Sequence, residues 1–181
     1  MSILATRYAE SLLSLAIDKN KVSEYKDEIK LIKKAFDDAE VIKFFESSKV
    51  SKEEKKNLCK TIFNGKIDKY VLNFLYVLVD RGRIVKYKEI FEEFNSMCLN
   101  ELNIEEGIIE SPRPIEQSLI EELEKMLAKD GKKVELSQKI NKSLISGFKI
   151  TLPSKIIDNS MKEKISKMQE ALKRKDGNLW S

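Results

Sequence analysis

Residues Tyr70–Ile84 read YVLNFLYVLVDRGRI, an apolar run that ends at an aspartate, an arginine and a glycine. The run is typical of a helix with neighbours on several sides, and Gly82 accepts the left-handed conformation in which many helices end. We expect this helix to run from Tyr70 to Asp80 and the next one to begin at Ile84. The run is also rich in β-branched and aromatic residues, so it fits a buried strand as well. It is far shorter than the ~20 residues that a membrane-spanning helix needs.

On both sides of this run, up to about Asn103, apolar residues recur at the three- to four-residue spacing of helices. Ser51 and Glu54 form a capping-box pattern, which opens one of these helices. Short linkers between such helices favour antiparallel packing. We therefore predict an antiparallel bundle of six helices over residues 1–103.

After Asn103 the pattern changes to short strand-like segments interleaved with helices, which predicts a small α/β domain over residues 104–181. A helix over Ile115–Lys129 is expected to face inward with Leu119, Leu123, Met126 and Leu127. The expected strands are Ile104–Ser111, Lys132–Ser137 and Leu144–Leu152, the last with Gly147 in its interior, and Asp158-Asn159-Ser160 is expected to cap a last helix. The predicted fold is thus mostly α with a smaller α/β part.

The composition excludes several classes of function. The net charge of +4 is spread over both halves of the chain, so neither half is a basic domain of the kind that binds nucleic acid. The chain has no histidine, the commonest general base and metal ligand, and no glycine-rich phosphate loop. We therefore expect no catalytic residue, no metal and no cofactor. The first residues turn polar at Thr6-Arg7, so we expect no signal peptide.

The two cysteines, Cys59 and Cys98, fall on or beside apolar helix faces. Small buried hydrophobic side chains are the preferred interpretation, over a redox or disulfide role. Two cysteines suit a reducing cytosol.

Two helices carry more apolar surface than a bundle helix requires. These are Tyr70–Asp80 and the first helix, which has one apolar line from Leu4 to Ala16 and another from Ala5 to Ile17. Either both helices lie at the centre of the bundle, or they flank a groove that accepts an amphipathic helix. Asn73, the one polar residue in the run, is either a structural amide or a hydrogen-bonding group for a docked peptide.

Three blocks of sequence together resemble the delta subunit of F-type ATP synthases, the family of the mitochondrial oligomycin sensitivity-conferring protein. They are Arg7-Tyr8-Ala9 with Leu12, then Asn73–Ile84, and finally Lys139–Ile150 with Ile156–Ser160. They lie in order at the start, middle and end, so the resemblance covers essentially the whole chain.

The resemblance implies a non-catalytic stator subunit at the cytoplasmic face of the bacterial plasma membrane, present in one copy in a hetero-oligomeric complex. The bundle would bind the N-terminal helix of an alpha subunit, and the C-terminal domain would hold the ends of the membrane-anchored b subunits. Neither nucleic acid nor membrane insertion is implied. Carried over by position, the groove residues would be Tyr8, Ser11, Leu12 and Leu15 of the first helix with Asn73, Val77 and Leu78 of the fifth.

The chain departs from the family in one loop. The family usually has a Gly-Asp pair before the Val-Ile-Asp block, whereas this chain has Leu152-Pro153-Ser154-Lys155. Proline can fix a turn by its restricted φ angle. The alternatives to a stator subunit are a helical nucleic-acid-binding or general adaptor module, and a small enzyme.

Overall fold

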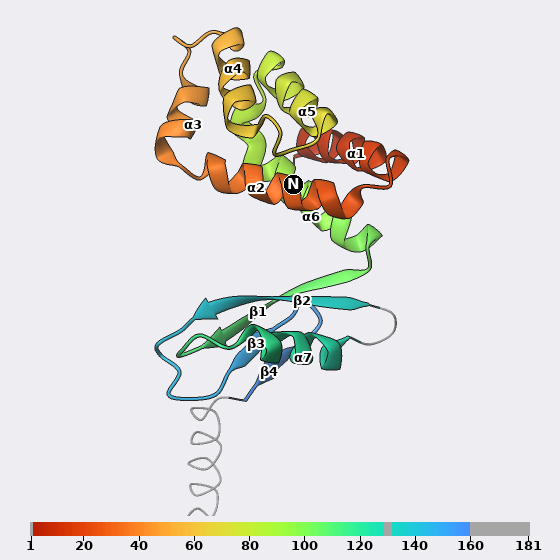
Figure 1. Ribbon diagram of the computed structural model, residues 1–181, viewed down its shortest axis with the longest axis vertical. Helices are drawn as coiled ribbons and strands as arrows, with labels where there is room; N and C mark the ends of the chain where they lie inside the picture. The colour runs from red at the N-terminus through yellow and green to blue at the C-terminus, as the bar shows by residue number, and fades with distance from the viewer. Residues whose placement is uncertain (1, 129–131, 160–181) are drawn as a thin grey trace, which may run out of the picture. The chain divides into compact units, whose positions relative to one another are not determined.

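The computed structural model describes residues 2–128 and 132–159 and divides the chain into two compact units (Figure 1). The first unit is Met1–Leu102 and the second is Asn103–Ser181, and each has its own hydrophobic core. The prediction of a helical N-terminal part followed by a smaller α/β part is confirmed. The last helix expected after Asp158 lies outside the described residues.

Among the described residues of the first unit, the chain forms six α-helices and one 3-10 turn. They are α1 (Ile3–Asp18), α2 (Val22–Phe36), α3 (Ala39–Glu46), α4 (Lys52–Phe63), α5 (Lys69–Asp80), η1 (Ile84–Lys86) and α6 (Tyr87–Glu101). The apolar run at residues 70–79 is therefore a helix and not a strand.

The helix ends follow local sequence chemistry. The Ser51 hydroxyl accepts a hydrogen bond from the Glu54 backbone N–H, and the Glu54 carboxylate accepts one from the Ser51 N–H, so the expected capping box is present. Gly82 follows α5 with a φ of 63°, a conformation that costs glycine little because it has no Cβ atom. The helix that contains the apolar run thus ends at Asp80, before Gly82, as predicted.

An aromatic cluster fills the core of the first unit around Phe36, the last residue of α2. Its ring contacts those of Phe45, Phe63, Tyr87 and Phe91, with centroid distances between 5.0 and 6.4 Å. The Tyr87 hydroxyl donates a hydrogen bond of 3.0 Å to the Phe36 carbonyl, so the polar atom of this buried tyrosine is satisfied. The cluster joins α2, α3, α4 and α6.

Both cysteines are buried in this core and are free thiols. Burial raises the pKa of each thiol to about 12, which keeps it protonated and unreactive near neutral pH. The interpretation of Cys59 and Cys98 as small hydrophobic residues is confirmed.

The described residues of the second unit form a four-stranded sheet with the order β2-β1-β3-β4, against which helix α7 packs (Figure 1). Strands β1 and β2 are parallel, whereas β3 pairs antiparallel with both β1 and β4. Side chains alternate across the sheet, so Ile109, Val134 and Ile150 lie in the small core. The elements are β1 (Ile104–Ser111), α7 (Gln117–Leu127), β2 (Lys133–Ile140), β3 (Lys149–Thr151) and β4 (Ile156–Asp158).

The predicted strand Leu144–Leu152 is wrong in its first part, because only Lys149–Thr151 is extended. The Asn141 side chain accepts hydrogen bonds from the backbone N–H and the hydroxyl of Ser143, which begins a turn. Gly147 has a φ of 87° and lies in a bend before β3, not inside a strand. Ile156–Asp158, whose last residue was expected to begin a helix cap, forms strand β4.

Strand β1 contains a close approach at Gly107 that the sequence analysis did not identify. A Cβ atom at this position would lie 2.5 Å from Leu152 Cδ2 and 3.1 Å from the Thr151 carbonyl oxygen. A larger residue at position 107 would therefore displace the end of the Leu152 side chain and press on the Thr151 carbonyl, so glycine is favoured where β1 lies against the end of β3.

The turn between β3 and β4 contains the sequence that departs from the family. Leu152 and Lys155 exchange backbone hydrogen bonds of 2.8 and 3.3 Å, with Pro153 and Ser154 as the central residues. The Ser154 N–H donates to the Glu105 carboxylate at 2.9 Å. The Ser154 side chain, and after it this N–H, hold the pKa of Glu105 below its usual range. Proline and the carboxylate of β1 therefore form a tight hairpin turn at this position.

A carboxylate of helix α7 accepts a backbone hydrogen bond from the edge strand β2. The Leu136 backbone N–H donates to the Glu124 carboxylate of α7 at 2.7 Å. Leu136 lies opposite Gly107 in the parallel pairing of β2 with β1. The bond to Glu124 is an additional contact, which attaches β2 to α7.

Candidate partner-binding surface on α1 and α5

Helix α1 presents one side to the core and a second, partly apolar side beside it. Its core positions are Ala5, Ala9, Leu12 and Ala16. Tyr8, Ser11 and Leu15 lie about one-quarter to one-third of a turn away, since each residue advances a helix by about 100°. Tyr8 and Leu15 are half-buried and Ser11 is exposed.

Helix α5 has a matching arrangement. Its core positions are Val71, Leu75, Leu78 and Val79. Beside them, Tyr70 and Phe74 are half-buried and Val77 is 46% exposed, all at the three- to four-residue spacing of one helix side. Asn73 is exposed next to this side.

Two contacts join the sides of α1 and α5. The Tyr8 and Phe74 rings meet edge to face with centroids 6.3 Å apart. The Lys19 ammonium group lies 5.0 Å from the centre of the Tyr70 ring. We call the accessible residues of these two sides the α1–α5 surface: Tyr8, Ser11, Leu15, Tyr70, Asn73, Phe74 and Val77.

The seven groove residues expected from the resemblance, which are not the same seven as those of the α1–α5 surface, divide into two groups by burial. Tyr8, Ser11 and Leu15 of α1 and Asn73 and Val77 of α5 are exposed or half-buried on the α1–α5 surface. Leu12 and Leu78, with 1% and 0% exposure, lie in the core beneath it. Tyr70 and Phe74 were not named, although their spacing to Val77 places them on the same side of α5.

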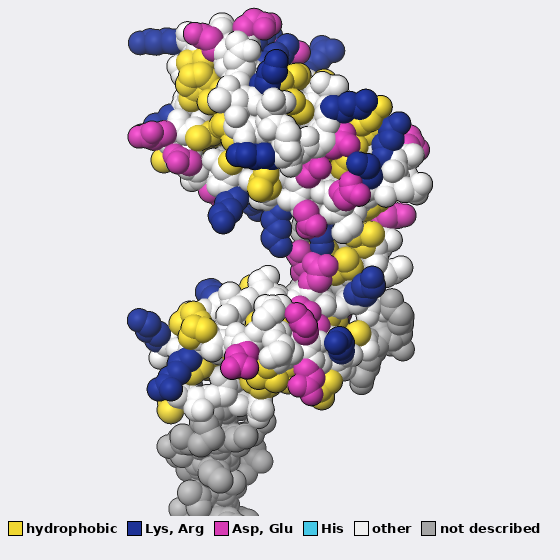
Figure 2. Space-filling view, in the orientation of Figure 1, with side chains coloured by type: hydrophobic (Ala, Val, Ile, Leu, Met, Phe, Trp, Pro, Cys, Tyr) yellow, Lys and Arg dark blue, Asp and Glu magenta, His cyan; other side chains and the backbone are white. Residues whose placement is uncertain are grey.

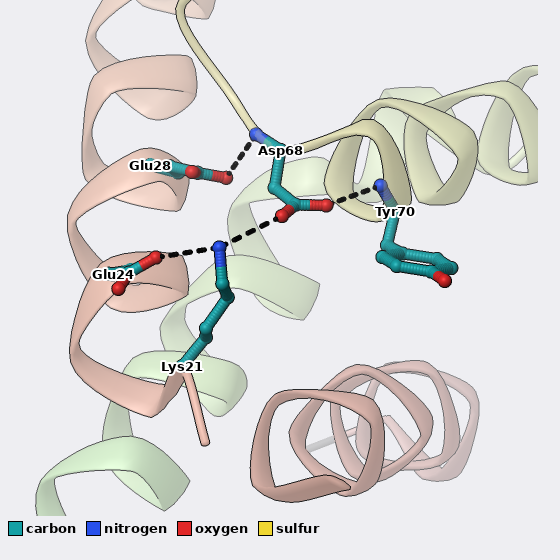
Figure 3. Close-up of polar contacts among 5 residues, drawn as sticks. All are labelled: Lys21, Glu24, Glu28, Asp68 and Tyr70. Carbon is teal, nitrogen blue, oxygen red and sulfur yellow. Dashed lines mark hydrogen bonds and ion pairs between the residues drawn. The ribbon is translucent and has the colours of Figure 1, made fainter. Parts of the chain in front are cut away.

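The beginning of α5 is held by a network of charged groups (Figure 3). Asp68 caps the helix by accepting a hydrogen bond of 2.8 Å from the Tyr70 N–H. The Lys21 ammonium group lies between Asp68 and Glu24, at 3.3 and 3.0 Å. The Asp68 N–H donates to the Glu28 carboxylate in the middle of α2 at 3.0 Å, so α2 fixes the start of α5.

The pKa values in this network follow from these bonds. The hydrogen bond from the Tyr70 N–H, aided by Lys21, holds the pKa of Asp68 below its usual range. Burial raises the pKa of Glu28, and it raises the pKa of Tyr25 to about 12 with a further contribution from the Asp68 charge. At neutral pH Asp68 is therefore ionised and Tyr25 is protonated.

Replacing Asp68 with alanine is expected to destabilise the protein by about 1 kcal/mol at pH 7, because α5 loses its N-cap. A folded-state pKa below the usual value of about 4 gives stabilisation that is complete above that value and is lost as the pH falls through the folded-state pKa. The difference in stability between wild type and Asp68→Ala should therefore shrink between about pH 5 and about pH 2. Urea unfolding followed by circular dichroism measures both effects.

The matched control for this prediction is Asp27→Ala, which removes an exposed carboxylate from α2. It should change the stability by less than about 0.5 kcal/mol. Equal stabilities of Asp68→Ala and Asp27→Ala at pH 7 would show that the cap does not hold α5.

The visible face of the molecule carries acidic and basic side chains side by side, with no continuous basic field (Figure 2). The described residues contain no group of three or more carboxylates or cysteines that could hold a metal ion. No helix in the described ranges is long and apolar enough to cross a membrane.

Comparisons with known proteins identify the family of this chain. The family model for the ATP synthase delta (OSCP) subunit matches residues 4–172. An ATP synthase subunit delta of Mesomycoplasma hyopneumoniae (strain 7448) is 35% identical over 169 residues, which cover 92% of this chain and 90% of that relative. An ATP synthase subunit delta of Clostridium beijerinckii is 33% identical over 178 residues, covering 96% of this chain and 98% of the relative.

A chain in the structure of the Toxoplasma gondii mitochondrial ATP synthase hexamer shares the fold, with a TM-score of 0.68 and 21% identity. The match covers 94% of this chain and 98% of that one. This chain belongs to the ATP synthase delta (OSCP) subunit family. It is a non-catalytic subunit of the peripheral stalk of an F-type ATP synthase.

Proposed function

We propose that the first unit binds the N-terminal helix of the ATP synthase alpha subunit across the α1–α5 surface. The observation that carries this proposal is the apolar side of α5, where Val77 remains 46% exposed beside the Tyr8–Phe74 contact. An amphipathic helix laid along α1 and α5 would cover Val77, Leu15 and the edges of the two rings. Ser11 and Asn73 would then lie at the margin, where their side chains can bond to a helix backbone or polar side chain.

Leu12 and Leu78 were expected to line the groove, but in this proposal they do not contact the partner. Because both are buried, they belong to the core against which Tyr8 and Leu15 pack, and they do not contact the partner directly. Tyr70 and Phe74 take their place among the contacting residues. The network around Asp68 fixes the direction in which α5 leaves its N-terminus, so the surface is formed before the partner binds.

The second unit is proposed to hold the C-terminal ends of the b subunits. It carries exposed apolar side chains on α7 and on the sheet, with Met126 at 67% and Ile156 at 64% exposure. Apolar side chains at these positions are suited to a partner helix, because they gain from removal from water. At the position where the family usually has a Gly-Asp pair, the tight turn at Pro153-Ser154 joins strands β3 and β4.

One copy of the chain would then connect the catalytic head to the b subunits, on the cytoplasmic face of the bacterial plasma membrane. Such a connection keeps the head from turning with the rotor, so that rotor torque is used for ATP synthesis. The requirement on this subunit is a long-lived attachment at both ends. A nucleic-acid-binding role would need a basic face, and the face drawn in Figure 2 carries charges of both signs side by side.

Calorimetric titration of the full chain with a peptide of the alpha-subunit N-terminus from the same organism tests this function. We expect one-to-one binding with a negative heat-capacity change and little dependence on salt, because the contact is mainly apolar. Absence of binding to the folded chain would reject the proposed role of the α1–α5 surface. Binding that weakens steeply with salt would show that charge pairing, and not the apolar surface, holds the peptide.

A further inference from the structure

A shallow pocket of about 260 Å³ lies between α2 and the end of α4, and it shares no residue with the α1–α5 surface. Its apolar lining is formed by Leu31 and Ala35 of α2 and by Ile62 and Phe63 of α4. Phe63 is buried and forms part of the core, whereas Leu31 is 45% exposed. A partner that covers the exposed part of Leu31 removes apolar surface from water, which favours binding.

Two lysines, Lys34 and Lys66, complete the lining, which contains no acidic side chain. Within the described residues, neither ammonium group has a carboxylate partner. Other lysines of the first unit do pair, for example Lys33 with Glu92 at 3.0 Å and Lys56 with Asp80 at 2.7 Å. The pocket therefore combines an apolar floor with unpaired positive charge.

The dimensions of the pocket select the kind of occupant. Sites for small molecules and cofactors usually measure about 300–1,000 Å³ and enclose most of the ligand. This pocket is smaller and open, which suits a single large side chain that projects from a peptide. The two lysines favour carboxylates beside that side chain.

We propose that this pocket is a second docking site of the first unit, which accepts an acidic amphipathic helix of a partner chain. A leucine-sized side chain of the helix enters between Leu31 and Ile62. Glutamates or aspartates one turn before and after it pair with Lys34 and Lys66, because side chains separated by three or four residues share a helix face. The proposal extends the proposed function by a separate site and does not depend on the α1–α5 surface.

Two synthetic helical peptides of equal length are the probes. One carries a central leucine with glutamates one turn away on each side, and the other has lysines in place of the glutamates. The full chain, labelled with ¹³C at leucine and isoleucine methyl groups, is titrated with each peptide. We expect saturable shifts of the Leu31 and Ile62 methyl signals with the glutamate peptide and at least about tenfold weaker binding of the lysine peptide.

The double variant Lys34→Glu with Lys66→Glu should reverse this preference, weakening the glutamate peptide by about tenfold or more. The matched control is Lys43→Glu with Lys49→Glu, which changes the net charge equally at exposed positions outside the pocket and should leave the affinity within about twofold. The variant Val77→Asp should also retain binding, which separates this site from the α1–α5 surface.

Equal affinities for the two peptides, or equal effects of the two double variants, would overturn the proposal. So would shifts of methyl groups spread over the whole unit, since nonspecific attraction would then explain the binding. Loss of binding in Val77→Asp would assign the peptide to the α1–α5 surface and reject the second site.

Discussion

Replacing Phe36 with alanine should destabilise the first unit by about 3–5 kcal/mol, the usual cost of removing a buried aromatic ring. Phe36 is fully buried and its ring contacts four others, from α3, α4 and α6. The cavity would lie where these helices meet, so none of them can close it without moving away from the rest. A domain of this size has a free energy of unfolding of roughly 5–15 kcal/mol, so the loss of this one ring would remove a large part of it.

Thermal and urea unfolding of the full chain, followed by circular dichroism at the helix band, measure this effect. The melting temperature of the first unit should fall by at least about 12 °C, since 1 kcal/mol corresponds to about 4–8 °C in a domain of this size. Phe44→Ala is the control, because Phe44 is half-buried and contacts only the Phe45 ring in the cluster. A loss in Phe36→Ala no larger than in Phe44→Ala would contradict the central role of Phe36.

Replacing Val77 with aspartate is expected to weaken binding of the alpha-subunit peptide by at least about tenfold. Full burial of an exposed valine contributes about 1.5–3 kcal/mol, and a partner that covers the 46% of Val77 still exposed gains about half of that. A carboxylate in its place must lose water without a partner, which adds to the loss. Because Val77 is 46% exposed in the free chain, the substitution should leave the fold of the bundle unchanged. Calorimetry gives the affinity, and circular dichroism verifies the fold.

Val85→Asp is a matched control for this prediction, since Val85 is also 46% exposed but belongs to η1. It should leave the affinity within about twofold. If both variants weaken binding equally, added negative charge explains the loss and the α1–α5 surface does not. If Val77→Asp binds as tightly as the wild type, the peptide binds elsewhere.

The helices of the first unit could be predicted because their periodicity extends over several turns. The apolar run at residues 70–79 was ambiguous between helix and strand, and Asp68 resolves it by capping the first turn of α5. Strand β1 was also predicted with its observed bounds, Ile104–Ser111. In contrast, Leu144–Leu152 has strand-like composition, but the Asn141 turn and the positive φ of Gly147 prevent extension over its first half.

Depth was harder to predict than position. Leu119 and Met126 were expected to face inward, yet they are 42% and 67% exposed, while Ile120 is buried. The sheet covers only one side of α7, so the broad apolar face of this helix is half exposed. The same difficulty applies to Leu12 and Leu78, which periodicity places near the partner-binding side although the packing of six helices buries them. The pocket between α2 and α4 could not be predicted because it depends on how two helices distant in sequence pack.

The bond between Glu124 and the Leu136 N–H has a consequence for how this chain meets copies of itself. An outermost strand with free N–H groups is a template on which a strand of another molecule can add, and long strands such as β2 are the most exposed to this. A carboxylate held over the middle of β2 occupies one donor and repels the carbonyl oxygens of an incoming backbone. This bond therefore disfavours the addition of a second copy's strand at the middle of β2.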